Sequence, residues 1–178
     1  MSTVTDYLVK EASKDGREIV IRAMRPDDKE RLFKAFVNLQ PHTIRMRFFY
    51  AKKSLKEDEL RWLEEIGHGN HVGLAATVPC GREELIIGEG SYAACGRTAE
   101  IGFTVVEAWQ GRGIASRLLQ HLASIARDRG IDRFEAYVLR GNEPMLAVFR
   151  HSGFAMTTRE DLGALHVTLL LDSPAAPR

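Results

Sequence analysis

The first third of the chain changes from a strand pattern to a helical one. Residues 1–16 are mostly polar, and apolar and polar positions alternate over residues 18–24, which predicts a strand after an N-terminal segment. Apolar side chains then recur every three or four positions up to Gly67. This spacing predicts a helical insert of three helices, at residues 27–40, 42–50 and 54–66.

From residue 71 onwards the pattern is that of a sheet accompanied by two helices. Three strand-like runs separated by short turns predict an antiparallel meander, at residues 71–78, 84–94 and 98–106. An amphipathic helix over 112–129 is followed by a strand, a helix and two strands, at residues 133–139, 143–151, 154–158 and 164–171. We expect one α/β domain over residues 17–172, with a mixed, mainly antiparallel central sheet, helices on both faces and a tail over 173–178.

The composition is typical of a globular protein in water. The 178 residues carry a formal net charge of +1, so charge gives no reason to expect nucleic acid or a membrane as a partner. No signal peptide and no apolar run of bilayer length is evident, which predicts a cytoplasmic protein. Cys80 and Cys95 are expected to be buried free thiols. No residues have the spacing of a metal site, so no metal is expected.

Residues 110–115, with the sequence Gln-Gly-Arg-Gly-Ile-Ala, lie between a predicted strand and the amphipathic helix. Two glycines separated by a single residue let the backbone close around an anion that a Cβ would exclude. Backbone N–H groups then converge near the helix N-terminus, where the helix dipole adds partial positive charge. The loop therefore predicts a site for a phosphate or pyrophosphate group.

A dinucleotide site is one interpretation of this loop. Residues 111–116 approach the G-x-G-x-x-G fingerprint, and Glu135 follows at about the distance of a ribose-binding carboxylate. The third small residue is Ser116, however, and an antiparallel meander precedes the loop where a dinucleotide fold has parallel strand–helix–strand units. The order of the elements argues against this interpretation.

Two separated motifs resemble those of the GNAT superfamily of acetyl-CoA-dependent N-acetyltransferases. Residues 110–115 fit the Q/R-x-x-G-x-G/A loop of that family, and residues 99–109 look like the strand that leads into it. Residues 142–154 resemble its second signature, an Asn after the fifth strand and a Gly-Phe pair after the next helix. The resemblance implies a GNAT-like sheet splayed between its fourth and fifth strands, with acetyl-CoA as the co-substrate.

The resemblance also implies roles for individual residues. The residues expected to bind the coenzyme are Phe103, Thr104, Val105, Gln110, Gly111, Arg112, Gly113, Ile114, Ala115, Ser116 and Asn142. Arg112 would add a charge-assisted bond to the pyrophosphate, and an amide of the strand would stabilise the oxyanion formed from the thioester. Glu100 is similar in position to the catalytic glutamate of the protein-lysine branch, which makes it the expected general base for the amine.

Phe149 departs from the family pattern. Many members have a Tyr at this position as the general acid for the departing thiolate, and a Phe cannot donate a proton. Either Tyr92, Tyr137 or His166 acts instead, or the thiolate leaves unprotonated, since a coenzyme A thiol is acidic enough. Cys95 as a nucleophile is a further alternative, but a structural thiol is favoured because no His lies near it in sequence.

Residues 41–49 resemble a segment of bacterial protein-lysine acetyltransferases, although ordinary helix packing with a basic face accounts for them equally well. The favoured acceptor is therefore the primary amine of a protein lysine. A small amine, such as a polyamine or an amino acid, is the first alternative. A non-catalytic acyl-CoA sensor or interaction module is the second, and Phe149 supports it. Edge strands near the C-terminus could pair two chains into a homodimer.

Overall fold

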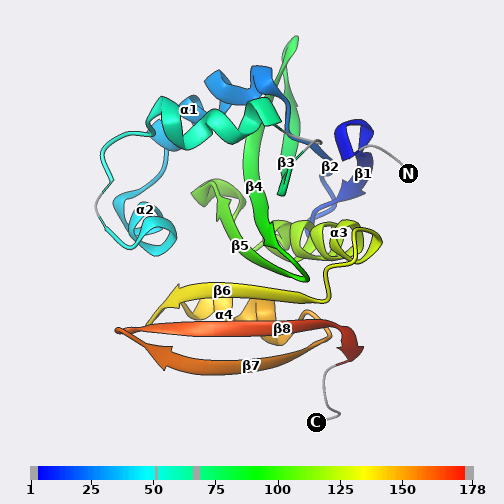
Figure 1. Ribbon diagram of the computed structural model, residues 1–178. Coiled ribbons are helices and arrows are strands. Elements are labelled where there is room, and N and C mark those ends of the chain that lie inside the picture. The colour runs from blue at the N-terminus through cyan, green and yellow to red at the C-terminus, as the bar shows by residue number, and fades with distance from the viewer. Residues whose placement is uncertain (1–3, 51, 66–68, 175–178) are drawn as a thin grey trace.

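Eight strands form one open sheet in the computed structural model, which describes residues 4–50, 52–65 and 69–174 (Figure 1). They are β1 (Leu8–Ala12), β2 (Glu18–Ala23), β3 (His71–Cys80), β4 (Glu83–Cys95), β5 (Thr98–Val105), β6 (Arg133–Leu139), β7 (Phe154–Asp161) and β8 (Ala164–Pro174). Their order across the sheet is β1-β2-β3-β4-β5-β6-β8-β7. All neighbours are antiparallel except β5 and β6, which confirms the predicted mixed, mainly antiparallel sheet.

The sheet divides between β5 and β6. These parallel strands pair at only three positions, from Thr98 with Arg133 to Glu100 with Glu135. Beyond Glu100 they separate, and the resulting opening is visible between the two ribbons in Figure 1. The splay predicted between the fourth and fifth strands is therefore confirmed. It leaves the backbone groups of residues 101–105 on this side facing the opening rather than a neighbouring strand.

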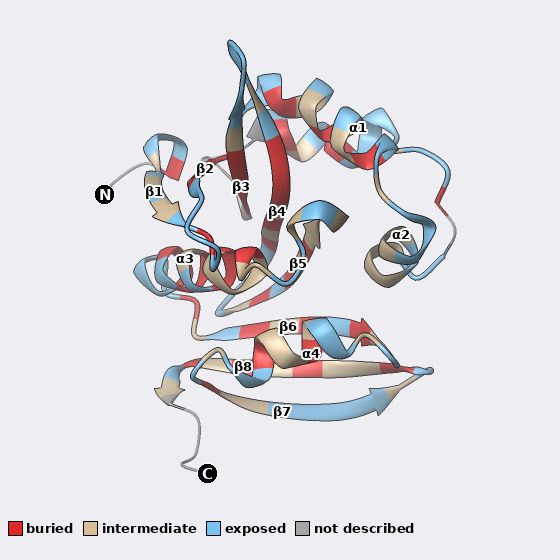
Figure 2. Ribbon diagram, turned by 180° about the vertical axis from the view of Figure 1, so that it is seen from behind, coloured by how far each residue is buried: buried red, intermediate tan, exposed pale blue. Residues whose placement is uncertain are grey.

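One face of the sheet is covered by α3 (Ile114–Asp128) and α4 (Glu143–Arg150). The buried residues of α3 recur at helical spacing and include Ile114, Leu118, Leu119, Leu122, Ala123, Ile125 and Ala126. They form the side of the helix that packs on the strands (Figure 2). Burial of each larger aliphatic side chain stabilises the fold by about 1.5–3 kcal/mol. The core beneath α3 therefore also fixes the loop over residues 110–113, which leads directly into this helix.

The opposite face carries the helical insert, which lies between β2 and β3. It contains η2 (Pro26–Asp28), α1 (Lys29–Val37), α2 (Pro41–Phe48) and the 3₁₀ helix η3 (Glu57–Glu65). Leu32 of α1 and Leu60 and Leu63 of η3 pack on Met24 and Ile86, whereas α2 has no buried residue. The third predicted helix is a 3₁₀ helix that starts three residues later than expected, and its predicted end at Gly67 lies outside the described residues.

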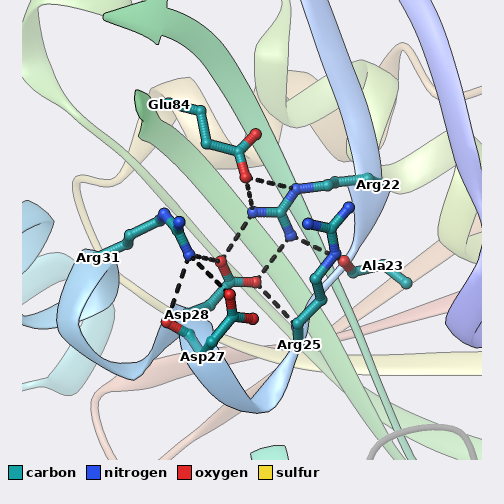
Figure 3. Close-up of polar contacts among 7 residues, drawn as sticks. All are labelled: Arg22, Ala23, Arg25, Asp27, Asp28, Arg31 and Glu84. Carbon is teal, nitrogen blue, oxygen red and sulfur yellow. Dashed lines mark hydrogen bonds and ion pairs between the residues drawn. The ribbon is translucent and has the colours of Figure 1, made fainter. Parts of the chain in front are cut away.

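A buried polar cluster fastens the insert to the sheet (Figure 3). The guanidinium of Arg22 on β2 donates from Nη1 and Nη2 to both carboxylate oxygens of Asp28, at 2.7 Å each, and from Nε to Glu84 of β4 at 3.0 Å. Asp28 also accepts from the backbone N–H of Arg25 at 2.8 Å and from Arg31 at 3.2 Å. Burial alone would raise the pKa of Asp28, but these donors lower it below its usual value.

Three features differ from the sequence predictions. Strand β1 lies within the polar N-terminal segment and pairs with β2 from Leu8 to Ala12; as a half-exposed edge strand it carries no continuous apolar pattern. Strand β8 extends to Pro174, three residues past the predicted end. Cys80 and Cys95 are exposed rather than buried, because each ends a strand at a turn. None of the helices in the described ranges combines the length and apolar character needed to cross a bilayer.

Candidate active site

A cleft of about 670 Å³ occupies the opening between β5 and β6. Its walls come from these two strands, the loop before α3 and the helices α2 and α4. All of the predicted site residues line this cleft except Arg112. The structure therefore brings together residues that lie more than 40 positions apart in the sequence.

The loop over residues 110–113 has the backbone of an anion site. Gly111 and Gly113 have φ angles of 71° and 80°, in the left-handed region that favours glycine. Gly113 is the N-cap of α3, and no side chain caps the helix there. The first N–H groups of a helix have no partner within it. Those of α3 begin at Ile114, and they face a cleft that Ala115 and Ser116 also line.

Lys14 is a cation beside this loop that the sequence did not single out. Lys14 lies in the β1–β2 turn, lines the cleft, and donates its backbone N–H to the carbonyl of Arg112 at 3.0 Å. Its side chain runs along Gly113, where a built Cβ would lie 3.2 Å from Cε of Lys14. The contact joins two segments about 100 residues apart, so no local pattern could have indicated it.

Arg112 is engaged elsewhere. Its guanidinium forms an ion pair with Asp15 and lies over the ring of Trp109, 5.1 Å from the centroid. A hydrogen bond from Ser13, together with the charges of Arg112 and Arg17, holds the pKa of Asp15 below its usual value. The charge of Arg112 is thus directed at the β1–β2 turn, and its expected contact with pyrophosphate stays a prediction.

Strand β5 presents different chemistry on its two faces. Phe103 is buried against Phe149 of α4, with ring centroids 6.3 Å apart. Glu100, Gly102 and Thr104 alternate with the buried positions and face the insert side. Glu100 is exposed and lies in the cleft at the last paired position of β5 and β6, opposite Glu135. A carboxylate therefore stands where the two strands begin to separate.

Two side-chain amides organise the ends of the cleft. Gln110 donates to the carbonyl of Val105 at 2.9 Å and to the hydroxyl of Thr43 on α2 at 3.2 Å. Asn142 is the N-cap of α4 and accepts from the backbone N–H of Met145 at 3.3 Å. Gln110 thus connects the loop to the insert, and Asn142 begins α4 at the cleft.

The predicted proton donors have different surroundings. Tyr92 is 2% exposed, lies beside Phe134 in the core and does not line the cleft, and burial raises its pKa to about 12. Tyr137 is 43% exposed and lines the cleft on β6. His166 stacks on Tyr137 and lies 3.4 Å from Glu135. Cys95, at the β4–β5 turn, is outside the cleft.

A second pair of charges lies beside the cleft and was missed in the sequence. Nε of Arg47 on α2 is 3.8 Å from a carboxylate oxygen of Glu89 on β4, and Glu89 accepts from the hydroxyl of Thr104 at 2.9 Å. The side chain of Glu89 is 17% exposed. Its burial raises its pKa, against the opposing effects of Arg47 and Thr104. The sequence pattern showed Arg47 only as part of a basic helix face.

Behind this pair is a smaller, mainly apolar cavity of about 130 Å³ under the insert. It shares Arg47, Phe48 and Thr104 with the main cleft. Within the described residues, no group of three or more His, Cys, Asp and Glu side chains could hold a metal ion.

Comparison with known proteins places the chain in a family. Residues 22–154 match the model of the acetyltransferase (GNAT) family. The chain is 32% identical over 154 residues to acetyltransferase Pat of Mycolicibacterium smegmatis, a match that covers 84% of this chain and 45% of Pat. The chain therefore belongs to the GNAT acetyltransferase family, and it spans less than half the length of that curated relative.

Solved structures agree with this assignment. The GNAT domain of S. lividans PAT superposes with a TM-score of 0.79 at 31% identity, covering 90% of this chain and 95% of that domain. The yncA protein of Salmonella typhimurium, solved with its cofactor acetyl-CoA, has the same fold, with a TM-score of 0.68 at 20% identity over 90% of this chain and 98% of that one. The predicted membership of the acetyl-CoA-dependent GNAT family is confirmed.

Proposed function

We propose that this chain transfers the acetyl group of acetyl-CoA to a primary amine, with a protein lysine side chain as the favoured acceptor. The observation that carries this proposal is the position of Glu100, an exposed carboxylate in the cleft where β5 and β6 begin to separate. A coenzyme bound in the opening would place its acyl group beside this residue. The family relationship supports acetyl-CoA as the donor.

The coenzyme would be held mainly by backbone groups. The free N–H groups at the start of α3, from Ile114 to Ser116, would bind the pyrophosphate, and Lys14 would supply the positive charge. The unpaired edge of β5 over residues 103–105 would bind the pantetheine arm and the thioester carbonyl, opposite the amide of Asn142. A donor aimed at the carbonyl oxygen stabilises the oxyanion by about 3 kcal/mol.

Glu100 would act as the general base. The amine nitrogen attacks the thioester carbon while a carboxylate oxygen of Glu100 takes up a proton from the nitrogen. The tetrahedral intermediate then collapses, the carbon–sulfur bond breaks, and the sulfur leaves with its electron pair. Tyr137 lies in the same cleft and would protonate this thiolate, because Tyr92 is buried in the core.

A protein lysine is favoured because the base is reached from solvent. Glu100 is exposed, and the neighbouring wall is α2, a helix without buried residues. A long lysine side chain can enter such a site from a folded protein surface. Small amines would be better retained by an enclosed pocket around the base.

Kinetics of Glu100→Gln test this proposal. We expect kcat to fall by about 10²–10⁴-fold, as is usual for loss of a general base, with little change in the affinity for coenzyme. Glu83→Gln, an exposed glutamate at the start of β4 outside the cleft, is the matched control. Unchanged turnover of Glu100→Gln across the pH range would remove Glu100 from this role. Coenzyme binding without turnover on any lysine peptide or small amine would favour a sensor.

A further inference from the structure

The guanidinium of Arg47 lies directly against the backbone of β5. A Cβ built on Gly102 would be 2.8 Å from both Cζ and Nη2 of Arg47 and 3.2 Å from Nη1. A Cβ at this position would force the guanidinium to shift, so glycine lets the side chain lie against the strand as it does. The chain thus has a glycine at the position on β5 that an arginine from the insert covers.

The buried donor of Arg47 has no hydrogen-bond partner among the described residues. Its Nε is buried and makes no hydrogen bond, and Glu89, at 3.8 Å, is beyond hydrogen-bond distance. Among the described residues, its charge also lies over the ring of Phe48, 5.2 Å from the centroid. A guanidinium has five N–H donors, and a buried donor without a partner destabilises the protein by about 1–3 kcal/mol.

Arg22 shows what a satisfied arginine looks like in the same molecule. Its donors are used by two carboxylates and a backbone carbonyl, with Nη1 bonded to the carbonyl of Ala23 at 2.9 Å. Arg47 has the same chemistry without those acceptors, and its side chain remains 31% exposed in the cleft. The missing acceptors are therefore expected from a ligand.

Arg47 and Glu100 line the same cleft. Gly102 and Glu100 are two residues apart on the same face of β5, about 7 Å along the strand, and both line the cleft with Arg47. The backbone and α3 side of the cleft is where the coenzyme would lie, whereas Arg47 comes from α2 on the insert side. A ligand group bound to Arg47 would therefore belong to the amine acceptor.

We propose that Arg47 binds a carboxylate carried by the acceptor near its amine. This inference rests on the proposed acetyl transfer and adds a substrate class to it: acceptors with an anionic group, as opposed to simple amines. A carboxylate matches the planar fork of a guanidinium in two parallel hydrogen bonds. It comes either from the acceptor's own carboxyl group, as in a free amino acid, or from an acidic residue beside the target lysine of a protein.

Two pairs of acceptors separate these sources, with kcat/KM as the measurement. Lysine and cadaverine share the terminal amine and differ by the carboxylate. For a protein acceptor, we use two lysine peptides, one with an Asp and one with an Asn next to the lysine. They share the lysine amine and differ only by the neighbouring carboxylate. We expect the carboxylate-bearing member of at least one pair to be preferred by tenfold or more. Preference in the first pair indicates a small acceptor, and preference in the second a protein.

Variants of α2 and β5 then assign the preference to this contact. Arg47→Ala should abolish it and leave coenzyme binding unchanged, and Arg47→Lys should restore only part of it, because an ammonium lacks the bidentate fork. Gly102→Ala, which displaces the guanidinium, should act like Arg47→Ala. Arg45→Ala, an exposed arginine on the same helix that lies outside the cleft, should leave the preference intact.

The possible failures are distinguishable. Turnover with equal kcat/KM within both pairs, or a preference that survives Arg47→Ala, overturns the role of Arg47 and leaves the proposed transferase activity standing. Absence of turnover with all four acceptors, while the coenzyme still binds, overturns both proposals.

Discussion

Two arginines of this protein each face a carboxylate, and the surroundings of the two pairs differ. Arg22 is enclosed by Asp28 and Glu84, and the cluster is linked further by Arg31 and the backbone of Arg25 (Figure 3). Arg47 has a carboxylate at 3.8 Å and an Nε without a partner. The first arrangement is complete within the protein and joins the insert to the sheet, whereas the second is incomplete and lies at the cleft.

The pKa values of the two carboxylates are shifted in opposite directions. Burial acts on both and raises their pKa, but the hydrogen bonds from Arg22 and the Arg25 backbone reverse the effect for Asp28. Arg47 and Thr104 do not reverse it for Glu89, whose pKa stays raised. Direct hydrogen bonds from a guanidinium thus stabilise the charged form of Asp28, whereas the hydroxyl of Thr104 and an arginine beyond hydrogen-bond distance do not suffice for Glu89.

Substitution of Arg22, the arginine whose donors are satisfied within the protein, should have a large effect on stability. Arg22→Met leaves Asp28 buried without its main partner, and breaking a buried pair in this way lowers the free energy of unfolding by about 3–5 kcal/mol. Urea denaturation measures the change. Arg31→Met is the control, because its partly exposed pair should contribute less than about 1 kcal/mol. Similar losses for the two variants would contradict the structural role assigned to Arg22.

The pH dependence of stability should have opposite signs for the two carboxylates. Because the pKa of Asp28 is lowered on folding, its contribution is complete above the ordinary value of about 3.9 and is lost as the pH falls through the folded value. Asp28→Asn should therefore be less stable than wild type by about 1.5–3 kcal/mol at neutral pH, and the difference should narrow in acid.

For Glu89 the pKa is raised on folding, so its contribution is present below the ordinary value of about 4.3 and is lost as the pH rises through the folded value. As the pH increases through that value, the free energy of unfolding of Glu89→Gln should increase relative to that of the wild type. Thermal unfolding between pH 3 and pH 8 measures both variants. Parallel curves for Glu89→Gln and wild type would show that the burial of Glu89 has no such effect.

A similar contrast between a paired and an unpaired cation recurs among the described residues beside the loop over residues 110–113. Arg112 is paired with Asp15, whereas Lys14 lies along Gly113 in the cleft. Lys14→Ala should weaken coenzyme binding about tenfold, or about 1.4 kcal/mol, as measured by calorimetry. Lys10→Ala, whose exposed side chain pairs with Glu18 on the same hairpin, is the control.

A coenzyme that lacks the 3′-phosphate locates the contact of Lys14. The tenfold loss should persist with dephospho-coenzyme A if Lys14 binds the pyrophosphate. A loss confined to coenzyme A would move the contact to the 3′-phosphate, and equal affinities of Lys14→Ala and wild type would remove Lys14 from the site.

Arg47→Ala should have the smallest effect on stability. The side chain makes no hydrogen bond through Nε and is partly exposed, so its loss should change the free energy of unfolding by less than about 1 kcal/mol. Urea denaturation beside Arg22→Met gives the comparison directly. A loss as large as that of Arg22→Met would show that Arg47 serves the fold.

Local patterns predicted the parts of the molecule that depend on near neighbours. The glycines of the loop, the amphipathic helix that follows and the meander before it were visible in the sequence, because each depends on residues a few positions apart. The position of Glu100 followed from its motif. Strand β1 was missed because a half-exposed edge strand needs no regular apolar alternation.

Contacts between distant segments could not be predicted in the same way. Lys14 meets Gly113, and Arg47 meets Gly102 and Glu89, across separations of about 40 to 100 residues. In one sequence these residues are an ordinary turn lysine and an ordinary basic helix face. Their significance depends on the sheet bringing β1, β4, β5 and α2 to one place.

The three-position contact between β5 and β6 has a consequence for the amount of folded protein. A bound coenzyme in the opening would connect the two parts of the sheet, and a ligand at a hundred times its dissociation constant adds about 2.7 kcal/mol to stability. The resistance of this protein to unfolding and proteolysis would then rise and fall with the concentration of acetyl-CoA. The amount of folded protein in the cell would therefore follow the supply of that coenzyme.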